Sequence, residues 1–185
     1  MYYLLYPALL VSLAILFIGL KWTIAGLRNK TVGKFQFDEN QHTFTIIKSG
    51  IYSINIIGAG WSENQGSFFP AVRLEETNKS LELTIPFMSY RSMTGGNKMT
   101  EYAQFTAEIS GSYTLQCKNT ADLSAKESML MSKRIFQSDI HPSYLGICIK
   151  QTLTTRQQFF AIIFTILGVQ ATGASILGIY LVFIR

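Results

Sequence analysis

Residues 159–184 have the sequence FFAIIFTILGVQATGASILGIYLVFI, and none of these 26 residues is Asp, Glu, Lys or Arg. Fifteen of them are Phe, Ile, Leu or Val. A helix of this length rises about 39 Å, which exceeds the ~30 Å hydrocarbon core of a bilayer. The run therefore predicts a membrane-spanning helix that tilts in the bilayer or protrudes from it.

A second uncharged run, YYLLYPALLVSLAILFIGL at residues 2–20, lies near the other end of the chain. As a helix it rises about 28 Å, close to the thickness of the hydrocarbon core. A cleaved signal peptide and a buried helix of a soluble protein are the alternatives. Because the run lacks the basic residues that normally precede the apolar part of a signal peptide, we expect an uncleaved membrane anchor.

Charged residues are confined to the middle of the chain. They make up 15% of the 185 residues, whereas an average soluble protein has roughly 25%. All of them except Arg185 lie between residues 21 and 158. This distribution excludes a purely soluble protein, a disordered chain and a many-helix transporter, and it predicts two membrane spans that bracket one domain.

The middle of the chain has the pattern of β-structure. From Phe35 onward, apolar and polar residues alternate with a period of two, and turn-forming residues separate the runs. Only residues 124–134 are compatible with a helix. Strands are expected at residues 44–46, 52–56, 72–74, 81–85, 105–109, 113–117 and 145–149. These short runs predict an all-β antiparallel sandwich of the jelly-roll kind.

The predicted organisation has five segments. They are a first transmembrane helix with an interfacial extension (1–27), a basic linker (28–34), the β-sandwich domain (35–150), a second linker (151–158) and a second transmembrane helix (159–185).

One short pattern occurs twice in the domain. Residues 49–54, SGIYSI, and residues 110–115, SGSYTL, share the pattern S-G-x-Y-[ST]-[IL] and lie 61 residues apart. Glycine can adopt the positive φ of a tight turn, and the aromatic residue that follows begins an alternating strand. Duplication and convergence on the same hairpin chemistry both explain the repetition.

This repeated strand pattern resembles that of extracytoplasmic β-sandwich modules such as the GOLD and bacterial pre-peptidase C-terminal groups. It is also similar to uncharacterised bacterial envelope proteins in which such a module lies between two membrane helices. The resemblance covers residues 35–150 and transfers no functional residue. It implies an interaction or structural module on the extracytoplasmic side of a bacterial inner membrane.

The charges beside the membrane indicate the opposite orientation. Lys21, Arg28, Lys30 and Lys34 follow the first run, and Lys150 and Arg156 precede the second. The positive-inside rule would place these residues, and the domain with them, in the cytoplasm, although the rule weakens for long loops. We favour the extracytoplasmic side and leave the cytoplasmic side as the alternative.

The second uncharged run has the composition of a helix–helix contact. Small residues let membrane helices approach closely, and an amide at mid-depth needs a hydrogen-bond partner. The same face could instead pack on the chain's own first helix. The candidate interface consists of Gly168, Gln170, Ala171, Thr172, Ala174, Ser175 and Gly178.

Two loops of the domain contain large apolar residues that form a candidate binding surface. Apolar loops are costly to expose unless they meet a bilayer, another subunit or the domain's own core. The residues concerned are Trp61, Phe68, Phe69, Phe87 and Tyr90.

Motifs for catalysis and metal binding are weak. The two histidines, His42 and His141, have no neighbours at metal-ligand spacing. Ser138 and Asp139 lie beside His141 in sequence, which is not how a catalytic triad is assembled. Cys117 and Cys148 either form a disulfide or remain buried thiols. We expect no enzyme, cofactor or metal site, and the sparse basic residues indicate no nucleic-acid binding.

The sequence therefore predicts a non-enzymatic accessory or interaction subunit of a membrane assembly. Its expected partners are membrane lipids and either another membrane protein or a second copy of the chain. The alternatives are a membrane-anchored immunity or defence protein that captures a toxin, and an envelope ligand sensor.

Overall fold

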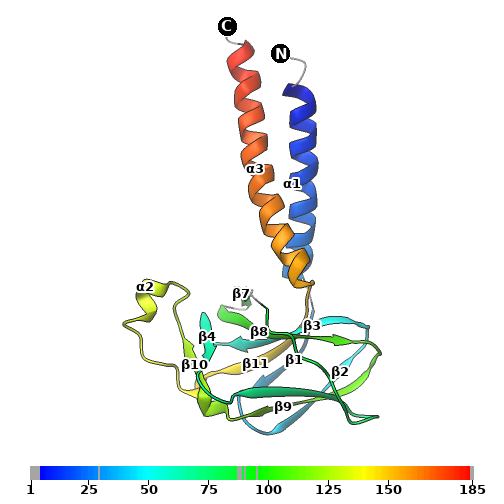
Figure 1. Ribbon diagram of the computed structural model, residues 1–185, viewed down its shortest axis with the longest axis vertical. Helices are drawn as coiled ribbons and strands as arrows, with labels where there is room; N and C mark the ends of the chain where they lie inside the picture. The colour runs from blue at the N-terminus through cyan, green and yellow to red at the C-terminus, as the bar shows by residue number, and fades with distance from the viewer. Residues whose placement is uncertain (1–4, 29, 87–88, 90, 95, 184–185) are drawn as a thin grey trace. The chain divides into compact units, whose positions relative to one another are not determined.

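The computed structural model describes residues 5–28, 30–86, 89, 91–94 and 96–183. Two long apolar helices flank an antiparallel β-sheet region in the sequence (Figure 1). The chain divides into two compact units. One combines Met1–Arg28 with Leu153–Arg185, and the other is Asn29–Thr152.

The helical unit consists of α1 (Leu5–Arg28) and α3 (Thr155–Phe183), which pack antiparallel to one another (Figure 1). Within them, Leu5–Gly26 and Thr155–Val182 are long and apolar enough to cross a membrane. This agrees with the two apolar helices that the uncharged runs predict.

The start of α3 differs from the expected start at residue 159, because a capping box extends the helix. The backbone N–H of Gln157 donates to Oγ1 of Thr154 at 3.1 Å, and the N–H of Thr154 donates to Oε1 of Gln157 at 3.2 Å. These bonds satisfy two backbone donors at the helix end. Residues 155–158 are therefore helical and not part of a linker.

The described residues of the β unit form three antiparallel sheets. The five-stranded sheet has the order β1-β11-β3-β8-β7, and the four-stranded sheet has the order β2-β9-β5-β6. A ribbon of β10 and β4 forms the third. The strands are β1 (Thr31–Gln36), β2 (Gln41–Ile46), β3 (Gly50–Ile57), β4 (Trp61–Asn64), β5 (Phe69–Leu74), β6 (Lys79–Ser80), β7 (Arg91–Thr94), β8 (Asn97–Ala107), β9 (Gly111–Lys118), β10 (Leu123–Lys126) and β11 (Gly146–Gln151).

The strands differ from the expected positions at β1 and at residues 81–85, and β4, β6, β7 and β10 lie where no strand was expected. Residues 31–34, expected in the basic linker, belong to β1, which pairs with β11 so that Phe35 lies opposite Ile147. The expected strand at residues 81–85 is reduced to a single bridge between Thr84 and Gln104. Helix is confined to α2 (Met131–Arg134) within the 124–134 region, because β10 occupies its start.

The two larger sheets share one hydrophobic core. Ile54 and Ile147 reach it from the five-stranded sheet, and Val72 and Leu115 reach it from the four-stranded sheet. All four side chains are fully buried. Aromatic rings connect the sheets as well, since Phe44 of β2 meets Phe105 of β8 edge-on at a centroid distance of 6.4 Å.

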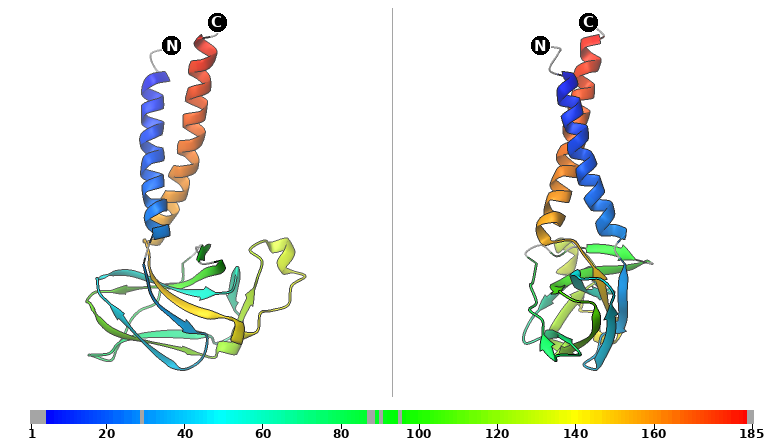
Figure 2. Two further views of the ribbon diagram at one scale, coloured as in Figure 1. Left: turned by 180° about the vertical axis from the view of Figure 1, so that it is seen from behind. Right: turned by 90° about the vertical axis from the view of Figure 1, so that its right-hand side faces the viewer.

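The two S-G-x-Y turns are not hairpins. Each turn passes from one large sheet to the other: β2 lies in the four-stranded sheet and β3 in the five-stranded sheet, while β8 and β9 cross in the reverse direction (Figure 2). The flanking strands then pair between the two copies of the pattern, β2 with β9 and β3 with β8. The repeated motif therefore forms two interlocked arches.

A tyrosine closes each arch. The phenol of Tyr52 donates to the carbonyl of Lys48 at 2.6 Å, and the phenol of Tyr113 donates to the carbonyl of Ile109 at 2.7 Å. Each ring also stacks on a phenylalanine from the other arch, Tyr52 on Phe105 and Tyr113 on Phe44. The repeat is thus longer than the sequence pattern suggested, because F-T-x-x-x-S-G-x-Y occupies both residues 44–52 and residues 105–113.

We expect Tyr52→Phe and Tyr113→Phe to lower the free energy of unfolding by similar amounts, about 1–2 kcal/mol each. Either substitution keeps the ring stack but removes the hydroxyl that donates to a turn carbonyl. Thermal unfolding in detergent, followed by near-ultraviolet circular dichroism, would measure the change. Tyr144→Phe is the matched control, because that side chain is exposed and should leave stability unaltered.

Candidate functional site

The first candidate surface is the face that α3 presents to α1, where the helix backbones approach closely. A Cβ atom built on Gly168 would lie 2.6 Å from the Cα of Leu16, and one built on Gly19 would lie 2.6 Å from the backbone nitrogen of Thr165. Only glycine permits these distances. Polar contacts reinforce the packing, since the Thr172 hydroxyl donates to the Ser12 hydroxyl at 3.2 Å.

Four of the seven predicted interface residues lie on this face. Gly168 and Thr172 contact α1 directly, and Gly178 lies beside the Leu5 side chain. Ser175 follows Thr172 by three residues, which keeps it on the same side of the helix, and it is buried. These small residues therefore serve the chain's own helix pair.

The other three predicted interface residues are exposed: Gln170, Ala171 and Ala174. Among the described residues, the amide of Gln170 has no hydrogen-bond partner. Gly173 is next to it on the helix, and a Cβ atom there would meet nothing within 4 Å. Ile166, Leu177 and Tyr180 continue this stripe at spacings of three and four residues and are also exposed. We call Ile166, Gln170, Gly173, Leu177 and Tyr180 the outer stripe of α3.

The predicted loop surface is not one continuous patch. Phe68 is buried in the core, where it contacts Phe37 and Tyr102, so it offers no exposed surface. Trp61 is half-buried, and Phe69 is exposed. Phe87 and Tyr90 lie outside the described residues.

Hydrogen bonds also hold the loop before Phe68 in place. The backbone N–H and the hydroxyl of Ser67 donate to Oδ2 of Asp122 at 2.9 and 2.8 Å. These bonds lower the pKa of Asp122, because they favour its ionised form. The loop is therefore attached to the turn that precedes β10.

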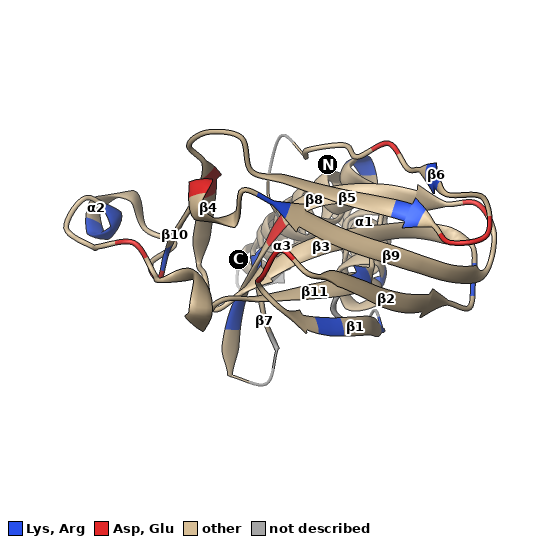
Figure 3. Ribbon diagram, turned by 90° about the horizontal axis from the view of Figure 1, so that it is seen from below, with Lys and Arg blue, Asp and Glu red and all other residues tan. Residues whose placement is uncertain are grey.

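An exposed apolar segment follows β10, and the sequence patterns did not single it out as a surface. Leu130, Met131, Ile135 and Phe136 are all more than half exposed, Phe136 to 88%. Lys133 and Arg134 lie among them on α2, which is blue in Figure 3. The guanidinium of Arg134 stacks on Trp61 at 4.6 Å from the ring centroid. We call residues 128–137 the α2 segment.

A ladder of buried polar residues lies on the five-stranded sheet. Ser53 and Asn55 alternate with core residues along β3, and Asn55 pairs across the sheet with Glu101 of β8. The Asn55 amide donates to the Ser53 hydroxyl at 2.9 Å, and the Gln104 amide donates to the Glu101 carboxylate at 2.9 Å. These bonds satisfy polar groups that would be costly to bury alone.

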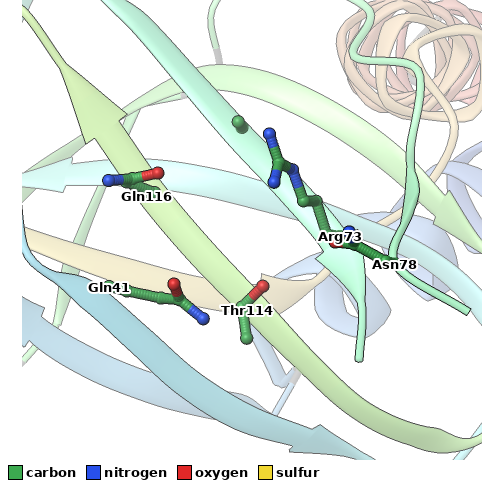
Figure 4. Close-up of a pocket in the computed structure, with 6 residues that line it drawn as sticks. Gln41, Arg73, Asn78, Thr114 and Gln116 are labelled. Carbon is green, nitrogen blue, oxygen red and sulfur yellow. The ribbon is translucent and has the colours of Figure 1, made fainter. Parts of the chain in front are cut away.

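A small polar pocket lies on the four-stranded sheet (Figure 4). Side chains of β2, β5 and β9 and of the turn residue Asn78 line it, with Arg73 as its one cation. Its lining includes no His, Cys, Asp or Glu, so it offers no ordinary general base. The lining residues are Gln41, Ala71, Arg73, Asn78, Thr114 and Gln116.

The described residues contain no group of three His, Cys, Asp or Glu side chains that could hold a metal ion. Nδ1 of His141 lies 2.8 Å from the Ser143 hydroxyl and also accepts the Ser143 backbone N–H. Since these contacts cap the short helix Pro142–Tyr144, the pair has a structural explanation. Cys117 and Cys148 are buried and unpaired.

The outer stripe of α3 and the α2 segment are thus two exposed apolar surfaces that also contain polar side chains, Gln170 in the first and Lys133 and Arg134 in the second. No protein-family model, curated protein or solved structure matches this chain.

Proposed function

We propose that this chain is a non-enzymatic accessory or interaction protein of a membrane assembly. In this proposal α1 and α3 span the bilayer as an antiparallel pair, and the β unit is a two-layered sandwich. The length and apolar composition of α1 and α3 support their role as membrane spans. The hydrophobic core that the two larger sheets share supports the sandwich. The two S-G-x-Y turns that resemble GOLD-like modules support an extracytoplasmic β unit at a bacterial inner membrane.

The observation that carries this proposal is the difference between the two faces of α3. One face is occupied by α1 through Gly168 and Thr172. The outer stripe has a polar amide near the middle of the helix, Gln170, beside the open position of Gly173. A lipid chain cannot hydrogen-bond that amide, whereas a second membrane helix can approach at the glycine and supply a partner.

A photo-crosslinking amino acid at Gln170 should yield a protein adduct in native membranes. The same amino acid at Ile176, which is also exposed but lies on another side of α3, is the control and should label lipid alone. Gly173→Leu should reduce the adduct formed at Gln170 by about tenfold, since a large side chain prevents close helix approach. Equal adducts from both sites, or an adduct that survives Gly173→Leu, would contradict this role for the outer stripe.

A further inference from the structure

We infer that the α2 segment of the β unit docks on the headgroup region of an anionic bilayer. The inference rests on the proposed membrane anchoring, but not on the outer stripe of α3. Four large apolar side chains of the segment are exposed: Leu130, Met131, Ile135 and Phe136. Few isolated proteins display such a cluster without a surface to receive it.

Specific contacts fix the conformation of the α2 segment, so its apolar side chains are held in exposed positions. The backbone N–H of Ser128 donates to Oε1 of Gln137 at 3.0 Å and closes the segment at its two ends. The Lys126 ammonium donates to the carbonyl of Arg134 at 2.9 Å, which ties α2 to β10. Arg134 stacks on Trp61 of β4.

The charge of the segment suits anionic headgroups. It contains two cations, Lys133 and Arg134, and no Asp or Glu. The nearest acidic residues in sequence are already paired, Glu127 with Lys98 at 2.9 Å and Asp139 with Lys126 at 3.9 Å. Apolar side chains with basic residues among them form the usual surface of an interfacial membrane-binding segment.

The bilayer is favoured as the occupant because the chain keeps it within reach. Two residues separate the end of α1 from the start of β1, and three separate the end of β11 from α3. At about 3.5 Å per Cα–Cα step, these connections extend no more than roughly 14 Å. A β unit attached at both ends to membrane spans therefore meets headgroups continuously, while a soluble partner must diffuse to it.

The test uses the full chain in nanodiscs that hold one copy, with an environment-sensitive fluorophore at Phe136→Cys. The native cysteines are buried, and Ile47→Cys is the matched control because Ile47 and Phe136 are both 88% exposed. Nitroxide-labelled lipid should quench the label at position 136 at least about threefold more than at position 47 when phosphatidylglycerol is present. The difference should shrink in pure phosphatidylcholine and at high salt.

A charge variant gives a second, independent measurement. The Lys133 side chain is exposed and takes no part in the Arg134–Trp61 stack, so the Lys133→Glu variant should fold normally. It should reduce the quenching that depends on anionic lipid by roughly half. Equal quenching at positions 47 and 136 would overturn the inference, as would shielding that appears only when two copies share a disc. Failure of the chain to insert at all would instead contradict the proposed anchoring.

Discussion

Replacing Gly168 with leucine is expected to separate α1 from α3. The first atom of the new side chain would lie 2.6 Å from the Cα of Leu16 and 2.8 Å from its backbone nitrogen. Backbone atoms of a helix cannot move aside as the end of a flexible side chain can. The helices must therefore move apart, at a cost of about 3 kcal/mol or more in packing.

A designed disulfide would measure the separation. The hydroxyls of Ser12 and Thr172 are 3.2 Å apart, so Ser12→Cys with Thr172→Cys should form a crosslink on oxidation, whereas residues farther apart cannot. Gly168→Leu should reduce the yield of this crosslink at least about tenfold.

Gly173→Leu is the matched control for that experiment, since it makes the same substitution where a Cβ atom meets nothing within 4 Å. It should leave the crosslink intact while it disrupts contacts at the outer stripe. An unchanged yield in Gly168→Leu would show that the two helices do not pack through this glycine.

The second large effect is expected at Cys117, whose thiol should be almost inert to alkylating reagents at neutral pH. Burial, with smaller contributions from Asp38 and Glu39, raises the pKa of Cys117 from 9.0 to about 12. Since the thiolate is the reactive form, this shift lowers its population roughly a thousandfold. In a Cys148→Ala background, mass spectrometry should show alkylation at least about a thousandfold slower than at Ile47→Cys.

The same shift sets a pH dependence of stability. A thiol whose pKa is higher in the folded state than in the unfolded state stabilises the fold below the unfolded pKa, about 9. That contribution is lost as the pH rises from 9 towards 12. Cys117→Ala should therefore lose less stability than the natural chain over this alkaline range.

In the alkylation experiment, rapid modification of Cys117 in the folded protein would contradict its burial.

Because the Cys117 thiol is unreactive in the folded protein, a different residue must report on which side of the membrane the β unit lies. Cys117 is buried, so its labelling would report unfolding and not orientation. Ile47→Cys is exposed, and an impermeant maleimide applied to intact cells should label it if the β unit is extracytoplasmic. Labelling that requires permeabilised cells would place the unit in the cytoplasm, as the positive-inside rule suggests.

The two long helices could be predicted because length and lack of charge are local properties of a sequence. The start of α3 was misplaced, although the signal for it, Thr154 followed by Gln157, is also local. Strands were predicted where apolar residues alternate. The edge strands β1 and β7 and the ribbon strand β4 were missed, because their apolar and polar residues alternate weakly. Strand β10 is buried, but its four residues, LSAK, are too few to show a period and are equally compatible with a helix.

Strand pairing could not be predicted from the repeated turns. A glycine followed by an aromatic residue begins a strand in a hairpin and in an arch alike, and the difference depends on residues some 60 positions away. Likewise, the small residues of α3 predicted a contact face but not which of them would meet α1. The exposed α2 segment was missed because apolar residues in a loop have the same composition whether they are buried or displayed.

The position of β11 has a consequence for how the protein is made. In the five-stranded sheet β11 lies between β1 and β3, although it is the last strand in the sequence. Only three residues separate β11 from α3. On the ribosome, β1 and β3 must wait with unpaired edges until more than eighty further residues have been synthesised. Such distant pairing is slow and leaves strand edges exposed. Completion of the sheet and emergence of the second helix are therefore nearly simultaneous, and a chain that ends before Gly146 would leave the sheet split in two.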